Sequence, residues 1–329
     1  MNKVVNPQKI AQGIYQIEIP TPFPVGPVNV YLLEGDCLTL VDVGPLTEEA
    51  WQTLSHGLKE IGYEITDIQQ IVLTHHHVDH FGLLERVRKV SGARTYAHPM
   101  AVPYVELNGK FLSYHSRFFF ELYTECGVPE ESLTVIDKFH NRTMTKFCEK
   151  SQIDECLKHE QTLPNMPEWQ ILYTPGHAQS QISLYRESDR VMIAGDHIIE
   201  HISSNAFIEP PQNQSGSRPL TLIQYRTALE MCADKEIEII FSGHGVPVTN
   251  HREKILERLQ KNWLRTDKLR SFLKDGEKTA YELTTLLFPN AYKKELALTL
   301  SETLGHIDLL RILHQIEVKR RNGVLYYSL

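Results

Sequence analysis

The sequence predicts an α/β fold in which β-sheets and helices pack in layers. The N-terminal segments show the apolar pattern of a β-hairpin, whereas later apolar runs alternate with helical patterns. A content of 41% hydrophobic and 23% charged residues is ordinary for a globular protein, and 329 residues provide room for about two domains. Periodicity alone therefore indicates a mixed α/β sandwich or another layered fold.

The N-terminal region is expected to contain strands followed by one helix. Residues 13–19, 28–35 and 38–44 are rich in β-branched and aromatic residues and are bounded by turn-forming residues. Residues 47–61 show the apolar spacing of a helix, and the short apolar run 71–73 indicates a buried strand. We expect this region to form a sheet with a helix packed on it.

Residues 99–160 form an insert that is unusually aromatic. Spacings of three and four between its aromatic residues predict a helix with an apolar stripe. The stripe either packs on the rest of the domain or forms a lid that shapes an apolar pocket, because long insertions often serve as binding elements. The aromatic residues are Tyr104, Phe111, Tyr114, Phe118, Phe119 and Tyr123.

The C-terminal segment is predicted to form a small domain of helices followed by a β-hairpin. It carries 15 Lys and Arg against 10 Asp and Glu, whereas the rest of the chain is acidic. Helices followed by a hairpin resemble a winged-helix module. The helices are expected at 251–273, 277–288 and 296–315, and the hairpin at 318–329 with its turn at Asn322-Gly323.

The segment THHHVDH, residues 74–80, gathers four metal-capable side chains directly after a predicted strand. Two imidazoles at i and i+2 of an extended segment point to the same side, so His75 and His77 can reach one ion. Asp79 and His80 can then serve a second ion beside the first. Imidazole nitrogen and carboxylate oxygen are ligands that suit zinc, and iron or manganese less exclusively.

Three later segments each place a His or an Asp where an apolar run ends. His177 follows Gly176, Asp196 follows Gly195, and His244 lies between two glycines. Loops at the edge of a sheet commonly carry function because a rigid scaffold fixes their direction, and glycine lets the backbone turn sharply. We therefore expect these side chains to gather at one sheet edge.

Together these motifs resemble those of the metallo-β-lactamase superfamily of metal-dependent hydrolases. Residues 75–80 match its HxHxDH motif at every position, and His177, Asp196 and His244 match its later motifs in order. The resemblance covers roughly residues 10–250. It implies the family's αββα sandwich, in which two sheets pack face to face with helices outside.

The resemblance also implies a division of the chain. Residues 1–249 would form the metallo-β-lactamase-like catalytic domain, with residues 99–160 as a helical insert. Residues 250–329 would form the small winged-helix-like domain that some members of the superfamily carry at this end. The overall expectation is an α/β protein with these three parts.

The resemblance implies two divalent cations, with zinc first and manganese or iron as alternatives. Seven protein ligands on two cations leave open positions for water and substrate, as a catalytic site requires. Gln181 departs from a common form of the family's second motif, which puts direct transfer of a relative's substrate in doubt. The implied ligand sets are His75, His77 and His177 for one ion, Asp79, His80 and His244 for the other, and Asp196 as the bridge.

Four residues are expected to have roles other than metal binding. Asp42 resembles the family's early aspartate, whose carboxylate supports the site from behind. Asp79, already a ligand, is also the candidate proton donor to the leaving group. Arg218 and Tyr225 are candidates for contact with substrate, because they lie in or just after a long polar loop that follows the bridging aspartate.

The function expected from this set is hydrolysis of an ester, thioester, lactone or lactam by hydroxide held at the metals. The alternatives are a phosphodiesterase or endoribonuclease, and a non-catalytic winged-helix regulator that binds nucleic acid. Lys319, Arg320 and Arg321 could meet phosphates, but Glu302 and Asp308 argue against a helix that reads a DNA groove.

The remaining expectations concern partners and location. A small-molecule substrate is expected, and nucleic acid and a homodimer remain open as partners. The sequence contains no apolar stretch of the roughly 18 residues that span a membrane, so no membrane association is expected. The N-terminus lacks an apolar signal core, and five cysteines show no C-x-x-C pair, which together indicate a cytoplasmic protein with reduced thiols.

Overall fold

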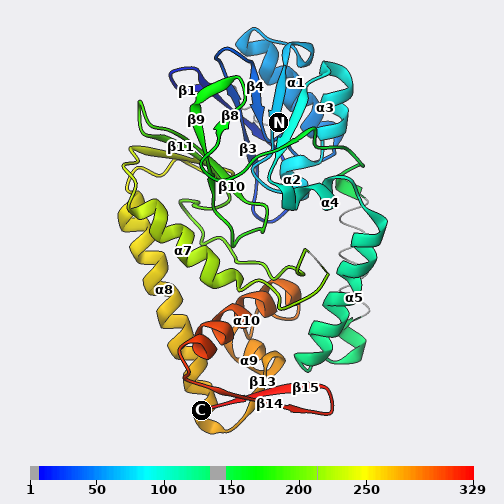
Figure 1. The fold of residues 1–329 in the computed structure, drawn as a ribbon, viewed down its shortest axis with the longest axis vertical. Helices are drawn as coiled ribbons and strands as arrows, with labels where there is room; N and C mark the ends of the chain where they lie inside the picture. Colours follow the sequence, from blue (N-terminus) through cyan, green and yellow to red (C-terminus); the bar gives the residue numbers. More distant parts are fainter. Residues whose placement is uncertain (1–6, 134–145, 213) are drawn as a thin grey trace.

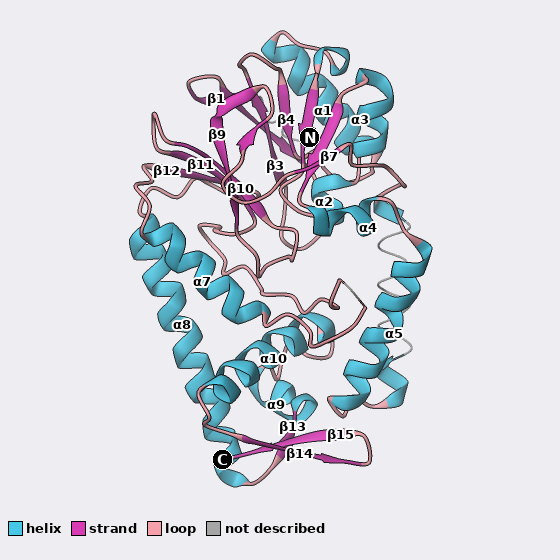
Figure 2. Cartoon of the chain, viewed as in Figure 1, coloured by secondary structure: helices cyan, strands magenta, loops and turns pink. Residues whose placement is uncertain are grey.

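The computed structural model describes residues 7–133, 146–212 and 214–329. Two β-sheets pack face to face in one half of the molecule, with helices on their outer faces (Figure 1). A smaller half consists mainly of helices and ends in a short sheet (Figure 2). The predicted αββα sandwich is therefore confirmed.

The first sheet contains seven strands in chain order. Its first four strands are antiparallel, and its last four pair in parallel from β4 onward. The predicted N-terminal strands and the strand before the metal motif are all present in it. The strands are β1 Gln8–Ala11, β2 Ile14–Ile19, β3 Val28–Leu33, β4 Thr39–Val41, β5 Gln70–Val72, β6 Arg94–Ala97 and β7 Glu155–Cys156.

The second sheet contains five strands in the order β12-β11-β10-β9-β8. Only β11 and β12 pair in parallel, so their carboxyl ends meet at one edge of the sheet. This pairing brings the segments that follow the two strands side by side. The strands are β8 Thr162–Leu163, β9 Met166–Tyr173, β10 Ile182–Arg186, β11 Val191–Gly195 and β12 Ile239–Ser242.

Helices cover both outer faces of the sandwich. The predicted helix 47–61 is α1, in which Thr47 caps the N-terminus by accepting from the amide of Ala50 and Gly62 ends the helix at φ 103°. The helices of the sandwich are α1 Glu48–Ile61, α2 Val78–Phe81, α3 Leu84–Ser91, α7 Thr221–Ala233 and α8 His251–Phe272, with a 3-10 turn at Ile65–Asp67.

Three apolar clusters separate the layers of the sandwich. Alternation along β3 sends Val30 and Leu32 toward α1 and α3, and Tyr31 and Leu33 toward the second sheet, as the period of a strand requires. The buried Trp169 belongs to the layer between the sheets. A third cluster joins the second sheet to α7. These layers hold the two sheet edges, and hence the loops that leave them, in fixed relative positions.

The aromatic insert forms two helices, α4 Val102–Val105 and α5 Gly109–Glu125, preceded by the 3-10 turn Pro99–Ala101. Part of the insert, residues 134–145, lies outside the described residues. Phe119 and Tyr123 of α5 are buried against the C-terminal helices, so this end of the predicted stripe packs. Tyr104 of α4 lies against His76 with the ring centroids 3.7 Å apart, beside the metal motif.

The C-terminal segment follows the predicted order of helices and hairpin, with one added strand. Its sheet has the order β13-β15-β14, and its hairpin turns at Asn322 and Gly323, both with positive φ. The strand β13 has only two residues and no periodic signal. The elements after α8 are the 3-10 turn Leu273–Asp275, β13 Lys278–Thr279, α9 Ala280–Leu287, α10 Leu296–Ile312, β14 Glu317–Arg321 and β15 Val324–Ser328.

One apolar cluster joins the insert to the C-terminal segment. It contains Phe119 and Tyr123 from α5, Ile208 from a loop, and Leu300 and Leu304 from α10. In Figure 1, α5 and α8 run down opposite sides of the smaller half, with α9 and α10 between them. The described helices include none with both the length and the apolar character needed to cross a bilayer.

Candidate metal centre

The metal motif and the three later segments meet at one end of the sandwich. The motif follows β5, His177 follows β9, Asp196 follows β11, and His244 follows β12. Backbone bonds fix the loops to one another: the amide of Ile182 donates to the carbonyl of Thr74, and that of Gly243 to Gly195. The strands of both sheets therefore deliver these side chains to one place.

Two glycines allow the close approach of these loops. A Cβ on Gly243 would collide with Oδ1 of Asp196 and lie 2.8 Å from the His80 ring. Gly195 adopts φ 51°, and a Cβ there would lie 2.7 Å from the side chain of Thr74. The sequence pattern of strand, glycine and ligand thus has a steric cause.

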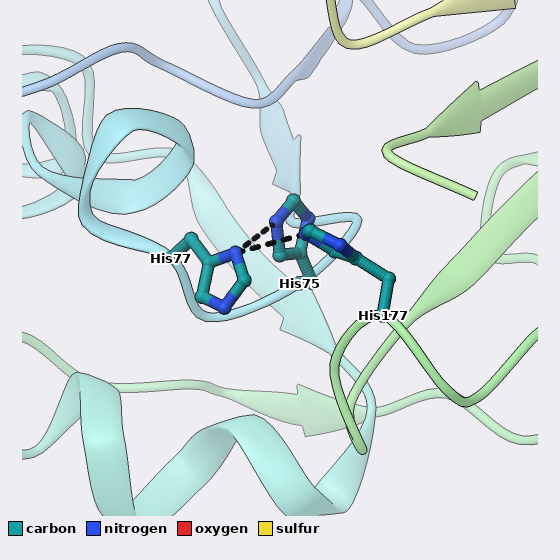
Figure 3. A group of neighbouring side chains, drawn as sticks. All are labelled: His75, His77 and His177. Atoms are coloured by element: carbon teal, nitrogen blue, oxygen red, sulfur yellow. Dashed lines mark hydrogen bonds between the residues drawn. The ribbon is translucent and has the colours of Figure 1, made fainter. Parts of the chain in front are cut away.

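All seven predicted ligands lie together, in three overlapping groups whose ligand atoms are within 4.8 Å of one another. In the first group, Nδ1 of His77 lies 3.0 Å from Nε2 of His75 and 3.0 Å from Nε2 of His177 (Figure 3). The three groups are His75, His77 and His177; His75, His80 and Asp196; and Asp79, His80 and His244.

Asp196 lies between the two predicted ion positions. Its Oδ2 is 3.5 Å from Nε2 of His177 and 3.5 Å from Nε2 of His244, and its Oδ1 is 3.4 Å from Nε2 of His80. One carboxylate therefore faces imidazoles of both predicted sets. This is the position that a bridging ligand requires.

Hydrogen bonds fix the tautomers of three imidazoles. Nδ1 of His177 donates to the carbonyl of Asn205, and Nδ1 of His244 donates to the carbonyl of Pro27, because carbonyl oxygens only accept. Nδ1 of His80 lies 2.8 Å from the carboxylate of Asp42. In each neutral ring the Nε2 lone pair then points into the cluster, where a cation would bind.

Asp42 and Thr74 hold a fourth imidazole in the same way. The hydroxyl of Thr74 donates to Oδ2 of Asp42 at 2.7 Å, and its amide donates to Oδ1 at 2.8 Å. The hydroxyl is therefore free to accept from Nδ1 of His75, 3.0 Å away. One buried carboxylate thus orients both His75 and His80, the role expected for Asp42.

The buried atoms of the cluster fit divalent cations. Nε2 of His80, Nε2 of His244 and Oδ1 of Asp196 have no hydrogen-bond partner among the described residues. An unpaired buried polar atom costs about 1–3 kcal/mol, and a charged one more. A cation between these atoms would satisfy all of them, and imidazole with carboxylate is a donor set typical of zinc.

In the metal-free protein, the imidazoles of the two predicted ligand sets differ in charge. Burial and the neighbouring imidazoles lower the pKa of His75, and they lower the pKa of His77 to about 3, so these rings are neutral. Burial also opposes charge on His80 and His244, but nearby carboxylates, Asp196 first, outweigh it and raise the pKa of both. A cation in the second set must therefore displace protons.

The two residues predicted to contact substrate make hydrogen bonds to other parts of the protein. Both terminal nitrogens of Arg218 bond the carboxylate of Asp308 on α10, at 2.6 and 2.8 Å. Tyr225 is fully buried on α7 and donates to the carbonyl of His197. Arg218 therefore ties its loop to the C-terminal helices, and Tyr225 supports the strand end that carries Asp196.

Sequence reasoning missed three residues that contact the cluster or its neighbours. Thr74 links Asp42 to His75, as described above. The ring of Phe207 lies edge-on to His77 and His177, with centroids 5.4 and 5.5 Å away. Glu209 is buried beside the insert. Thr74 lies inside the motif and could have been considered, whereas Phe207 and Glu209 lie in a loop without a periodic pattern.

Comparison with known proteins agrees with this geometry. The family model of the metallo-beta-lactamase superfamily matches residues 23–244, about two thirds of the chain. The chain therefore belongs to the metallo-β-lactamase superfamily, and it is a metal-dependent hydrolase.

Two relatives resemble the protein along its length. It is 35% identical over 317 residues to the "Probable metallo-hydrolase YqjP" of Bacillus subtilis (strain 168), covering 96% of this chain and 98% of the relative. It resembles the crystal structure of metallo-beta-lactamase family protein TTHA1429 from Thermus thermophilus, with TM-score 0.80, 28% identity, and coverage of 97% of this chain and 99% of that one.

A third likeness concerns the fold alone. The metallo-beta-lactamase GOB-18 from Elizabethkingia meningoseptica has TM-score 0.56 and 18% identity, covering 81% of this chain and 94% of that one. A fold shared by many hydrolases does not select a substrate. The substrate class must therefore be argued from the residues around the cluster.

Proposed function

We propose that the protein hydrolyses a small or medium-sized acyl substrate, meaning an ester, thioester, lactone or lactam, at a centre that holds two divalent cations. Zinc is the first choice for both cations, with manganese or iron as alternatives. The observation that carries the proposal is the meeting of seven ligand side chains in three overlapping groups. His75, His77 and His177 would hold one cation, and Asp79, His80 and His244 the other, with Asp196 between them.

The cations would supply a water whose pKa is near neutrality and would polarise the bond under attack. The protein's own residues prepare the site for them. Asp42 and Thr74 hold His75 and His80 with their Nε2 atoms facing inward. Because these rings are already oriented, little ordering of side chains is needed when cations bind.

Asp79 is proposed to take up the proton that the attacking water releases and to hand it to the leaving group. Its side chain is 13% exposed, against 2% for Asp42 and 8% for Asp196, so it is the carboxylate of the cluster most accessible to substrate and water. Its Oδ2 faces Nε2 of His244 at 3.4 Å, which leaves Oδ1 as the atom to carry the proton.

The surroundings of the cluster favour an acyl substrate over nucleic acid. Phe207 lies against His77 and His177, and Tyr104 packs against His76 and Phe111. Among the described residues, Asp79 and Asp196 form ion pairs only with histidines. Aromatic rings beside carboxylates that have no Lys or Arg partner among the described residues suit an apolar acyl group better than a phosphate backbone.

The C-terminal segment also offers little to nucleic acid. Helix α10, in the place of a recognition helix, buries eleven of its 17 residues. Arg320 pairs with Glu125 and Arg321 with Glu277, at the end of the molecule opposite the sandwich (Figure 1). We therefore propose a packing role for this domain and do not favour the phosphodiesterase or the nucleic-acid-binding regulator.

The first experiment combines elemental analysis of the purified protein with hydrolysis assays. The assays use a thioester, a p-nitrophenyl ester, a lactone, a β-lactam and bis-p-nitrophenyl phosphate. We expect about two cations per chain and turnover of at least one acyl substrate. Turnover of the phosphate diester alone would replace the proposal with a phosphodiesterase, and one iron without hydrolysis would replace it with an oxygenase.

A pair of variants tests the aromatic rings beside the cluster. Phe207→Ala should raise KM for substrates with an apolar acyl group by about tenfold, as expected for loss of a buried aromatic contact, and should change KM less for an acetyl ester. The matched control is Phe120→Ala, because Phe120 is 58% exposed on α5. If Phe207→Ala and Phe120→Ala changed KM equally, Phe207 would not be a contact of the substrate.

A further inference from the structure

Residues 204–209, here called the strap, run between the metal centre and the C-terminal helices. The strap has neither helix nor strand pairing. In an extended chain, successive residues face opposite sides. The contacts of the strap follow this alternation.

The odd-numbered residues of the strap face the metal ligands. The carbonyl of Asn205 accepts from Nδ1 of His177 at 3.0 Å. Phe207 contacts the rings of His77 and His177. Two adjacent positions of this side therefore fix the orientation of two ligands of the first set.

Glu209, the third odd-numbered residue, joins three separate segments. Its Oε1 accepts from the amide of Gln179 at 2.7 Å, two residues after His177. Its Oε2 accepts from the hydroxyl of Tyr104 at 3.2 Å. Oε1 also lies 3.8 Å from Nε2 of His76. One carboxyl group thus holds the His177 loop and the aromatic insert, and it faces the HxHxDH motif.

Two even-numbered residues of the strap, Ala206 and Ile208, contact the rest of the protein. Ala206 is buried against α7, where its carbonyl accepts from the hydroxyl of Thr221. Ile208 is buried among the C-terminal helices, and its amide donates to Oγ of Ser301 on α10 at 3.3 Å. The strap is therefore anchored on the side that faces away from the ligands.

We propose that Glu209 is a positioning residue of the metal centre, and that the strap transmits the packing of α10 to His77 and His177. This inference rests on the proposed metal centre but not on the proposed acyl substrate. The C-terminal domain would then act on hydrolysis through ligand geometry, without itself touching substrate.

The chemistry of Glu209 supports this role. It is 6% exposed, and its only ion-pair contact among the described residues is with His76, 3.8 Å away, whose pKa is held well below the usual range by burial. Burial raises the pKa of Glu209 to about 7, although the bonds from Gln179 and Tyr104 oppose this rise. A buried carboxyl without a counter-ion does not add stability by itself. Its two oxygens, however, accept from two different segments at once, which a glutamine with one acceptor oxygen cannot do.

The test compares Glu209→Gln with Glu85→Gln. Glu85 is a matched control because it is also a buried glutamate that accepts from a hydroxyl, that of Ser151, but it lies on α3 away from the ligands. The protein is loaded with Co²⁺, its absorption spectrum is recorded, and Zn²⁺ affinity is measured against a chelator. Residues that orient metal ligands typically change affinity by about 10- to 100-fold when mutated.

For Glu209→Gln we expect Zn²⁺ affinity to fall by about tenfold and the Co²⁺ bands to shift, whereas Glu85→Gln leaves both unchanged. In an active protein, kcat should fall with little change in KM. Tyr104→Phe, which keeps the ring and removes one donor, should give a smaller shift of the same bands. It serves as the second variant if Glu209→Gln does not fold.

A second pair of variants tests whether the strap transmits the packing of α10 to the ligands. Ser301→Ala removes the acceptor of the Ile208 amide and should shift the Co²⁺ bands, whereas Ser271→Ala, on the exposed surface of α8, should not. Bands identical to wild type in Glu209→Gln and Tyr104→Phe would overturn the role of Glu209. Wild-type bands in Ser301→Ala would overturn transmission from α10. A protein that binds cations but hydrolyses no acyl substrate would refute only the proposed substrate class.

Discussion

Oδ2 of Asp42 lies 2.8 Å from Nδ1 of His80, with both side chains almost completely buried. The same carboxylate accepts from Thr74, which contacts His75. Asp42→Asn should therefore place an amide N–H against Nδ1 of His80 or leave Thr74 without its acceptor. We expect cation affinity to fall by about 10- to 100-fold, measured by chelator competition.

The matched control for this prediction is Asp154→Asn. Asp154 accepts from the amide and the hydroxyl of Thr95, each at 2.8 Å, in the same pattern as Asp42 with Thr74. It lies beside β6, away from the ligands. The Asp154→Asn protein should lose a similar local hydrogen bond and keep its cations. Equal loss of cations in both variants would mean that Asp42 acts on stability alone.

Asp196→Ala should remove the ligand between the two predicted ion positions. We expect cation content to fall from about two to about one per chain and activity to fall by at least about 100-fold, with the circular dichroism spectrum unchanged. Asp189→Ala, at the opposite end of the β10–β11 hairpin, is the control. Full activity in Asp196→Ala would exclude the two-cation centre.

Arg218 forms an ion pair with the buried Asp308, so removing Arg218 leaves this carboxylate with the more exposed Arg311, 4.0 Å away, as its cationic partner among the described residues. Arg218→Ala should lower the free energy of unfolding by about 3–5 kcal/mol, measured by urea denaturation, with KM nearly unchanged. Arg218→Met combined with Asp308→Leu should recover much of this loss. A raised KM at unchanged stability would instead support the substrate role expected from sequence.

The carboxyl of Glu209 should make stability fall as pH rises. Burial raises its folded-state pKa from 4.5 to about 7, so the full contribution is present below pH 4.5 and is lost as the pH rises to about 7. The loss amounts to about 3 kcal/mol, at 1.36 kcal/mol per pKa unit. Urea denaturation of metal-free protein should show this fall in wild type and not in Glu209→Gln.

Glu85→Gln provides a control of opposite sign for this measurement. Burial favours the neutral form of Glu85, but bonds from Arg88 and Ser151 outweigh it and lower the pKa. The stability that Glu85 contributes is therefore fully present above pH 4.5 and is lost as the pH falls below this value, and Glu85→Gln should lack this loss. If the free energy of unfolding changed with pH in the same way in Glu209→Gln and Glu85→Gln, both assignments would be contradicted.

Much of the fold and the gathering of the seven predicted ligands in one place could be predicted because their signals are local. The ligands lie in one short motif or directly after apolar runs, and α1 carries its own cap at Thr47 and its own end at Gly62. The strands β7, β8 and β13 could not be predicted, because two residues show no period. The partners of β7 and β13, which are β6 and β15, lie far along the chain, whereas β8 pairs with the adjacent β9.

The contacts around the ligands were harder to predict for the same reason. Arg218 lies 90 positions before Asp308, and Glu209 lies 105 positions after Tyr104. A charged residue in a polar loop near the ligands looks available for substrate until its partner on a distant helix is known. Folding, and not local pattern, therefore decides which polar residues of this loop face the site.

The shared apolar cluster of α5 and the C-terminal helices has a consequence for how such proteins can diversify. Phe119 and Tyr123 share this cluster with leucines of α9 and α10. A recombinant that received the insert from one relative and the C-terminal helices from another would combine surfaces shaped for different partners. The two segments should therefore be inherited, and exchanged in chimeras, as a pair.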